Sequence, residues 1–169
     1  RDIGAYSLEW YQRYYGIHYP TDKCDMIALP DFAAGAMENV GCVTFHEDVL
    51  IFRSKVTERN YISRATTIHH EMAHMWFGDL VTMKWWQDLW LNESFAEWAS
   101  YMSVSESTQY KHAWTEFNSV RKNWAYRADQ LSSTHPIAVD MEDLDAVRTN
   151  FDGISYAKGA SVLQQLVAH

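Results

Sequence analysis

The segment His70-Glu71-Met72-Ala73-His74 places two histidines four residues apart, with a glutamate between them. In a helix, residues four apart lie on the same face, so both imidazole rings point at one spot. Two imidazoles suit a catalytic zinc ion, and the carboxylate of Glu71 lies within reach of a water on that metal. The pattern therefore predicts metal-assisted hydrolysis with Glu71 as the general base.

A third ligand is needed, because catalytic zinc takes three protein ligands and keeps a fourth position open. Glu93 is the candidate, since eighteen residues separate it from His74 and it lies early in the next predicted helix. The extended stretch 79–86 lets the chain double back, so that two antiparallel helices share one ion. The spacing thus predicts a single Zn2+ ion on His70, His74 and Glu93.

A competing interpretation places these polar residues on a solvated helix face without a metal. Apolar neighbours oppose it, since they indicate a largely buried helix, and buried His and Glu need partners. These neighbours are Ile68, Met72, Met75 and Trp76. His69 faces away from His74 in a helix, so we expect that it does not bind the metal and that it either has no role in the site or supports one of the ligands. Glu97 lies one turn beyond Glu93, and two interpretations stay open for it: a carboxylate that orients a ligand histidine, or a solvated helix residue.

The elements that position these residues follow from the spacing of apolar side chains. Helices are predicted over residues 1–15, 58–77, 89–105, 108–128 and 156–168, with mixed loop and short helix over 132–152. Strands are predicted over 25–29, 40–45 and 49–52, with a loop over 31–35, a polar turn over 46–48 and a strand or extended stretch over 80–85. The tryptophans at 76, 85, 86, 90 and 98 are predicted to lie mainly in the core, with one or two beside a substrate channel. This order predicts an α+β fold with a small mixed sheet beside a helical layer.

The composition narrows the class of protein. With 169 residues the chain is long enough for one domain, and a net charge of −8 without a basic run argues against nucleic-acid and anionic-membrane partners. There is no apolar run of about 18 residues, so no membrane-spanning segment is predicted. Cys24 and Cys42 are predicted to be free and buried. The chain starts without Met and ends inside a helical pattern, which predicts a fragment of a longer protein; the expected location is cytoplasmic.

Further motifs extend the pattern along the chain. Gly35-Ala36-Met37-Glu38-Asn39 precedes the histidine motif, the segment 85–92 leads into Glu93, and the segment 151–160 contains Tyr156. This combination resembles the M1 family of zinc aminopeptidases, the aminopeptidase N type of gluzincin. The resemblance covers almost the whole chain.

The resemblance implies that residues 1–169 are the peptidase M1 catalytic domain, of thermolysin-like zincin fold. It implies zinc on His70, His74 and Glu93, and removal of N-terminal residues from peptides with a free N-terminus. The glutamate at the position of Glu38 holds the α-amino group of the substrate in that family. A charge-assisted hydrogen bond of this kind fixes where the bound peptide begins.

The remaining implied roles concern the substrate main chain and the transition state. The resemblance implies that the segment 35–39 binds substrate, with Gly35 and Ala36 offering backbone groups to the peptide. It also implies that Tyr156 helps to stabilise the tetrahedral intermediate. Without the family, Tyr156 would be interpreted as a core tyrosine and Gly35 as a residue that permits a turn. The resemblance also implies an N-terminal β-domain and a C-terminal helical domain, which we expect to lie outside residues 1–169. We therefore expect the isolated chain to bind zinc with poor or no peptidase activity.

Two other functions stay open. A thermolysin-type zinc endopeptidase shares the histidine motif and the distant glutamate, but it has no use for Glu38 and tolerates a peptide with a blocked amine. A non-catalytic scaffold of the M1 fold is the second alternative. Metal analysis of the purified chain discriminates a scaffold from an enzyme.

Overall fold

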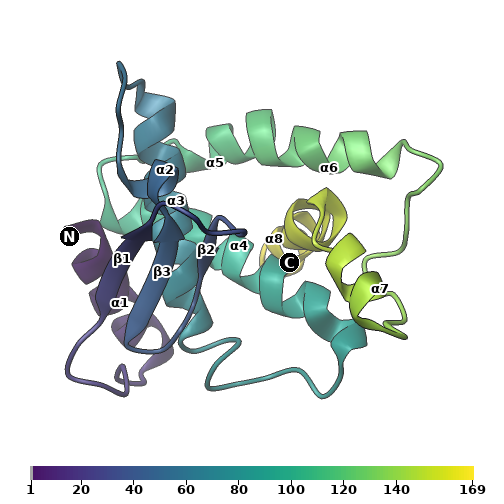
Figure 1. Cartoon of the computed structure of the whole chain (residues 1–169), viewed down its shortest axis with the longest axis horizontal. Helices are drawn as coiled ribbons and strands as arrows, with labels where there is room; N and C mark the ends of the chain where they lie inside the picture. The colour runs from purple at the N-terminus through teal and green to yellow at the C-terminus, as the bar shows by residue number, and fades with distance from the viewer. Residues whose placement is uncertain (1) are drawn as a thin grey trace.

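A three-stranded sheet and the first helix occupy one end of the molecule, and the later helices occupy the other (Figure 1). The computed structural model describes residues 2–169. Two long helices, α3 (Glu58–His74) and α4 (Leu89–Ser107), pack against each other. The predicted α+β class, with a small mixed sheet beside helices, is confirmed.

The sheet has β3 (Cys42–His46) at its centre, flanked by β1 (Asp25–Leu29) and β2 (Ala36–Met37). β1 runs parallel to β3, and β2 runs antiparallel to it. Val43 and Phe45 alternate along β3 and are completely buried, so one face of the sheet contributes to the core. β2 is an edge strand within the described part of the chain, so its outward backbone groups face no further strand.

The C-terminal half of α3, which carries the histidine motif, is buried at every residue from Ile68 to His74. The helix α1 (Asp2–Tyr15) packs on α3 and α4, with Tyr11 completely buried. Gly78, just beyond α3, has a φ of 138°, and a Cβ there would lie 2.9 Å from His74 Nδ1. A glycine therefore lets the chain turn away from α3 in close contact with His74.

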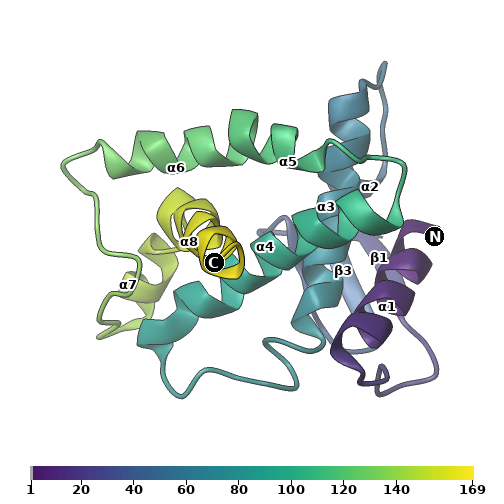
Figure 2. The ribbon, with the colours of Figure 1, turned by 180° about the vertical axis from the view of Figure 1, so that it is seen from behind.

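Shorter helices form the rest of the molecule. Figures 1 and 2 show α5, a π-helical turn η2 and α6 as one continuous rod, with α8 lying between this rod and α4. A second π-helical turn, η3, leads directly into α8. The bounds are η1 (Trp86–Asp88, a 3-10 turn), α5 (Ala113–Glu116), η2 (Phe117–Arg121), α6 (Lys122–Asp129), α7 (Leu144–Thr149), η3 (Ile154–Lys158) and α8 (Gly159–Val167).

Two predicted elements differ from the structure for local reasons: one strand is absent, and one helix begins later than predicted. The strand predicted over 49–52 does not form, because Glu47–Leu50 is the short helix α2, whose start is capped by His46 Nδ1 accepting from Asp48 N at 3.3 Å. The helix predicted from residue 108 begins at Ala113, because the backbone of Thr108 is extended and ends α4 there, and the Thr108 hydroxyl accepts a hydrogen bond from Tyr110 N at 3.1 Å in the turn that follows.

The stretch 80–85, predicted as a strand or an extended stretch, forms no strand: it has a single bridge, between Phe77 and Val81, and the backbone of Trp85 is extended. Trp85 and Trp86 are 60% and 43% exposed, so these two lie outside the core, and Trp86 borders the cavity that contains the candidate site. The other tryptophans of that set are buried or half-buried.

Cys24 and Cys42 are free, as predicted, but they are half-buried rather than buried. Within the described residues, no helix combines the length and the apolar character that crossing a membrane requires.

Candidate metal centre

The side chains of His70, His74 and Glu93 converge on one point between α3 and α4. The Nε2 atoms of His70 and His74 lie 3.1 Å apart. Glu93 Oε2 lies 3.2 Å from His70 Nε2 and 3.6 Å from His74 Nε2. All three residues are buried and present one ligand atom each to a common point. The structure thus brings together the residues whose spacing predicted a metal site.

These distances suit a tetrahedral metal ion, because metal–ligand bonds of about 2.0–2.1 Å place two ligand atoms about 3.3 Å apart. His74 Nδ1 lies 3.1 Å from the Phe77 carbonyl oxygen, so its proton is on Nδ1 and Nε2 carries a lone pair. His70 Nδ1 lies 3.6 Å from Glu97 Oε2, which favours the same tautomer. Two lone pairs that face each other repel unless a cation lies between them. The donor set therefore fits a zinc ion.

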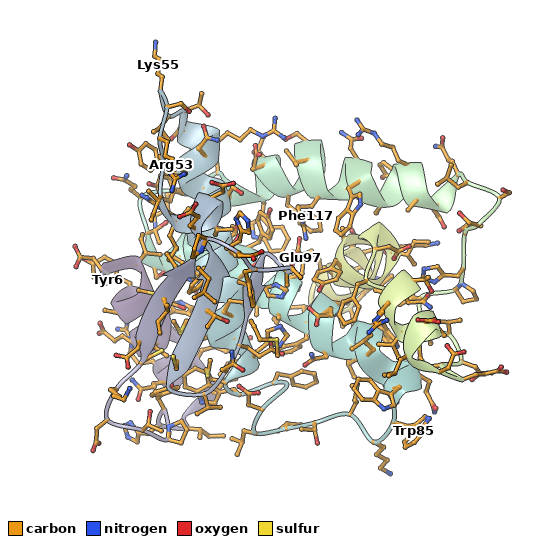
Figure 3. The ribbon with its side chains drawn as sticks, in the orientation of Figure 1. Tyr6, Arg53, Lys55, Trp85, Glu97 and Phe117 are labelled. Atoms are coloured by element: carbon orange, nitrogen blue, oxygen red, sulfur yellow. The ribbon has the colours of Figure 1, made fainter. Side chains whose placement is uncertain are left out.

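Glu97 lies in the centre of the molecule (Figure 3), where an ionised carboxylate needs a partner. Arg121 on η2 is that partner: its Nη2 donates to Glu97 Oε2 at 3.1 Å, and its Nε donates to Oε1. Burial opposes ionisation, but the charge of Arg121 lowers the pKa of Glu97 to about 2. Glu97 is therefore ionised beside His70, and the interpretation as a solvated residue is wrong. Arg121 could not be predicted from the sequence, because no spacing rule links residues 24 positions apart on different helices.

Glu71 lies beside the three candidate ligands and is only 5% exposed. Burial raises its pKa to about 7, and the negative charges of Glu38 and Glu93 act in the same direction. A carboxylate with a pKa near neutrality is suited to accept a proton and return it. The environment of Glu71 therefore suits the predicted general base.

Two cavities meet at this centre. The larger has a volume of about 600 Å³, and the three candidate ligands, Glu71 and the segment 36–38 border it. The smaller, of about 270 Å³, reaches Arg121 on the other side of His70. Glu38 borders the larger cavity and not the smaller one. Residues on both walls are Ala34, Ala36, His70, Glu71 and Tyr156.

Gly35 and Ala36 form the entrance to the edge strand β2. The Gly35 carbonyl accepts a hydrogen bond from His46 N at 2.8 Å, so it is used within the sheet. Ala36 faces Phe45 in the next register position, which is a non-hydrogen-bonded pair of the antiparallel ladder. The N–H and C=O of Ala36 therefore point to the outer edge of the sheet, which leaves Ala36 as the stronger candidate for main-chain contact with a ligand.

The later residues of this segment differ in position. Met37 and Glu38 line the larger cavity. Asn39 is exposed, and its side-chain amide donates to Thr44 Oγ1 at 3.3 Å. Asn39 thus braces β2 against β3, whereas Glu38 presents its charge toward the candidate metal centre.

Tyr156 reaches the same centre from η3. Its ring stacks on the His70 imidazole, with centroids 5.8 Å apart and an angle of 18° between the planes. Burial raises the pKa of Tyr156 far above its ordinary value, and the charge of Glu93 acts in the same direction. The hydroxyl therefore stays protonated and is available as a hydrogen-bond donor. Tyr156 is half-buried on the cavity wall, which differs from a core tyrosine.

His69 belongs to a separate buried network. Its Nδ1 lies 2.6 Å from Ser103 Oγ, which lies 3.0 Å from the Tyr11 hydroxyl. Burial lowers the pKa of His69 to about 3, so the ring is neutral. His69 therefore joins α1, α3 and α4 and is outside the group of candidate ligands, as predicted.

The similarity of this chain to known proteins covers nearly all of its residues. Residues 2–169 match the model of the Peptidase family M1 domain. Aminopeptidase N from Streptomyces lividans is 55% identical over 170 residues, covering 99% of this chain and 20% of that protein. Tricorn protease-interacting factor F2 from Thermoplasma volcanium is 47% identical over 165 residues, covering 98% and 21%. Aminopeptidase M1 from Arabidopsis thaliana is 44% identical over 168 residues, covering 99% and 19%. The chain spans about a fifth of the length of these relatives.

Proposed function

Because this chain belongs to peptidase family M1, we propose that the protein is a zinc metallo-aminopeptidase that removes N-terminal residues from peptides. His70, His74 and Glu93 hold one Zn2+ ion in this proposal, and the α+β arrangement around them supports a thermolysin-like zincin domain. The observation that carries the proposal is that Glu38, Glu71 and the candidate ligands border one cavity. A site for the substrate amine and a site for hydrolysis are therefore adjacent.

The reaction follows from the groups that surround the scissile bond. Zinc, when bound, lowers the pKa of its water to about 7 and polarises the substrate carbonyl. Glu71 takes a proton from the attacking water and returns it to the leaving amine when the C–N bond breaks. The Tyr156 hydroxyl donates a hydrogen bond to the oxyanion that develops on the carbonyl oxygen. His70 and Glu71 border both cavities. The scissile bond therefore lies where the two cavities meet, with the peptide extending into each of them.

Glu38 determines that cleavage occurs one residue from the end of the peptide. Its carboxylate binds the α-ammonium group through a charge-assisted hydrogen bond in the larger cavity. The backbone of the first residue pairs with the outward groups of Ala36, as an added strand at the edge of the sheet. The rest of the peptide continues past His70 toward the smaller cavity.

A peptide with a free amine, compared with its N-acetylated form, tests this proposal. We expect release of the free N-terminal amino acid from the first peptide and cleavage about 100-fold slower of the second, because acetylation removes the charge that Glu38 binds. The measurement is product analysis by mass spectrometry. Equal cleavage of the two peptides, at an internal bond, would identify an endopeptidase of the thermolysin type instead.

Glu38→Gln is expected to lower kcat/KM for free-amine substrates by about 10- to 100-fold, since a hydrogen bond to a charged group is worth about 1.5–3 kcal/mol. Zinc content should stay at the wild-type level, because Glu38 is not in the ligand group. Asp48→Asn, an exposed change on α2, is the matched control. Loss of zinc in Glu38→Gln would mean that Glu38 supports the metal centre and not the amine.

Glu97→Gln is expected to weaken zinc affinity by about 10- to 100-fold, because the neutral amide no longer orients His70 and leaves Arg121 without its counter-charge. Competition against a chromogenic chelator measures the affinity. Arg121→Lys keeps the positive charge with fewer hydrogen bonds, so its effect should be smaller. Unchanged zinc affinity in Glu97→Gln would show that the contact with His70 has no role in metal binding.

A further inference from the structure

Tyr156 lies at the centre of the π-helical turn η3. The Gly159 N–H donates to the carbonyl of Ile154, five residues back, which is the hydrogen bond that defines such a turn. Because the turn is locally irregular, the direction of the Tyr156 side chain depends on the contacts that hold its two ends. Both ends of η3 are held by close contacts with other helices or with the preceding loop.

The N-terminal end of η3 is held by Asp152 and Gly153. Asp152 Oδ1 accepts hydrogen bonds from the backbone N–H groups of Ile154 at 2.9 Å and Ser155 at 3.1 Å. Gly153 lies against α6, where an added Cβ would be 2.8 Å from the Cα atom of Ala125. The start of the turn therefore has little freedom to move toward α6.

Helix α4 contacts η3 near both of its ends, at Ser155 and at Gly159. Ser94 Oγ donates to the Ser155 carbonyl at 2.6 Å, and Ser94 is completely buried. Gly159 lies against the same side chain, since an added Cβ would be 1.9 Å from Ser94 Oγ and 2.9 Å from Ser94 Cβ. Both views show α8 lying across α4 (Figures 1 and 2), and the two helices pack together.

We propose that Ser94 and Gly159 are positioning residues that fix Tyr156 against the metal centre by locking η3 onto α4. Ser94 directly follows Glu93 in the chain, so the residue beside the candidate ligand makes the contact. The separation of Glu93 and Tyr156 is thus set by a close contact and not by a flexible connection. Neither Ser94 nor Gly159 lines the two cavities, so neither contacts substrate. This inference rests on the proposed function, in which the Tyr156 hydroxyl faces the oxyanion.

Gly159→Ala in the zinc-bound, full-length protein tests the lock, because the added Cβ pushes η3 away from α4. We expect kcat to fall by about 10- to 100-fold, since a misplacement of about 1 Å costs up to about 100-fold. KM should stay within about threefold and zinc content should not change, because Glu38 and the metal ligands lie on other elements. Steady-state kinetics with metal analysis measures all three.

A second substitution provides the rescue. Ser94→Gly removes the two nearest atoms that the new Cβ would meet and leaves only Trp90 Cε3, at 3.2 Å. The double variant Ser94→Gly/Gly159→Ala should therefore recover kcat to within about threefold of Ser94→Gly alone. If Gly159→Ala lowered kcat only by destabilising a helix, a new glycine at position 94 in α4 would not restore kcat. No recovery in the double variant would overturn the inference.

The background Tyr156→Phe separates this inference from the proposed function. With the hydroxyl gone, Gly159→Ala should cost less than about threefold in kcat, because the group that it misplaces is absent. An equal loss in both backgrounds would mean that Gly159 acts independently of Tyr156, and would overturn the lock while leaving the role of Tyr156 intact. Wild-type kcat in Tyr156→Phe would instead remove the proposed role of Tyr156, and the lock with it.

Two further variants keep the experiment decisive. Gly4→Ala on α1 is the matched control, because its Cβ meets the flexible Met26 side chain at 3.1 Å, away from the centre, and kcat should be unchanged. If Gly159→Ala does not fold, Ser94→Ala removes the hydrogen bond to the Ser155 carbonyl without adding atoms. It should lower kcat several-fold in the wild-type background and not in Tyr156→Phe, and the same loss in both would overturn the inference.

Discussion

Replacement of Glu71 by Gln is expected to lower kcat by roughly 10³- to 10⁴-fold while the protein keeps its zinc. Gln has nearly the same shape as Glu but cannot accept the proton of the attacking water at neutral pH. The carboxylate is 5% exposed, and burial raises its pKa to about 7, so Glu71 can accept that proton near neutral pH. Steady-state kinetics on a free-amine substrate, together with metal analysis, measures the effect.

The exposed substitution Glu142→Gln is the control for this change and should leave kcat at the wild-type value. Activity of Glu71→Gln within about tenfold of wild type would show that another group accepts the proton. A wild-type protein that binds zinc but hydrolyses no free-amine peptide would support the non-catalytic scaffold instead.

Much of the candidate site could be predicted from local periodicity. His70, Glu71 and His74 lie within one helical turn of each other, so their common direction needed only that α3 be a helix. Glu93 required one further assumption, that the chain doubles back between two packed helices, and α3 and α4 do pack in this way. Short-range rules therefore suffice where the ligands come from two regular helices.

The residues that the sequence did not reveal depend on tertiary packing. Arg121 meets Glu97 from a separate rod of helices, and this contact has no signature along the chain. β2 is only two residues long and forms because Ala36 and Met37 meet β3, so its apolar pattern is too short to predict a strand. The predicted helix start at Tyr156 conceals a π turn, since the hydrogen bonds that define it depend on close packing against α4.

Glu93→Gln is expected to remove zinc from the protein at ordinary metal concentrations, and activity with it. A structural zinc site is worth about 10–16 kcal/mol over four ligands, so loss of one anionic ligand should weaken binding by roughly 100- to 1000-fold or more. The buried charge of Glu93 also lies 3.2 Å from His70 and 3.6 Å from His74, so the substitution loosens the alignment of both imidazoles. Metal analysis after dialysis measures the loss, and circular dichroism checks that α3 and α4 remain folded.

The comparison with Glu71→Gln makes this prediction specific. Both substitutions change a buried glutamate to glutamine in the same cavity, so they alter the side-chain volume equally. If the ligand group is His70, His74 and Glu93, the change at Glu93 removes the metal, and the change at Glu71 abolishes catalysis with the metal in place. Zinc retained in Glu93→Gln and lost in Glu71→Gln would reverse the two roles. The zinc content of the two variants therefore distinguishes a metal ligand from a general base, because metal binding requires only the ligand.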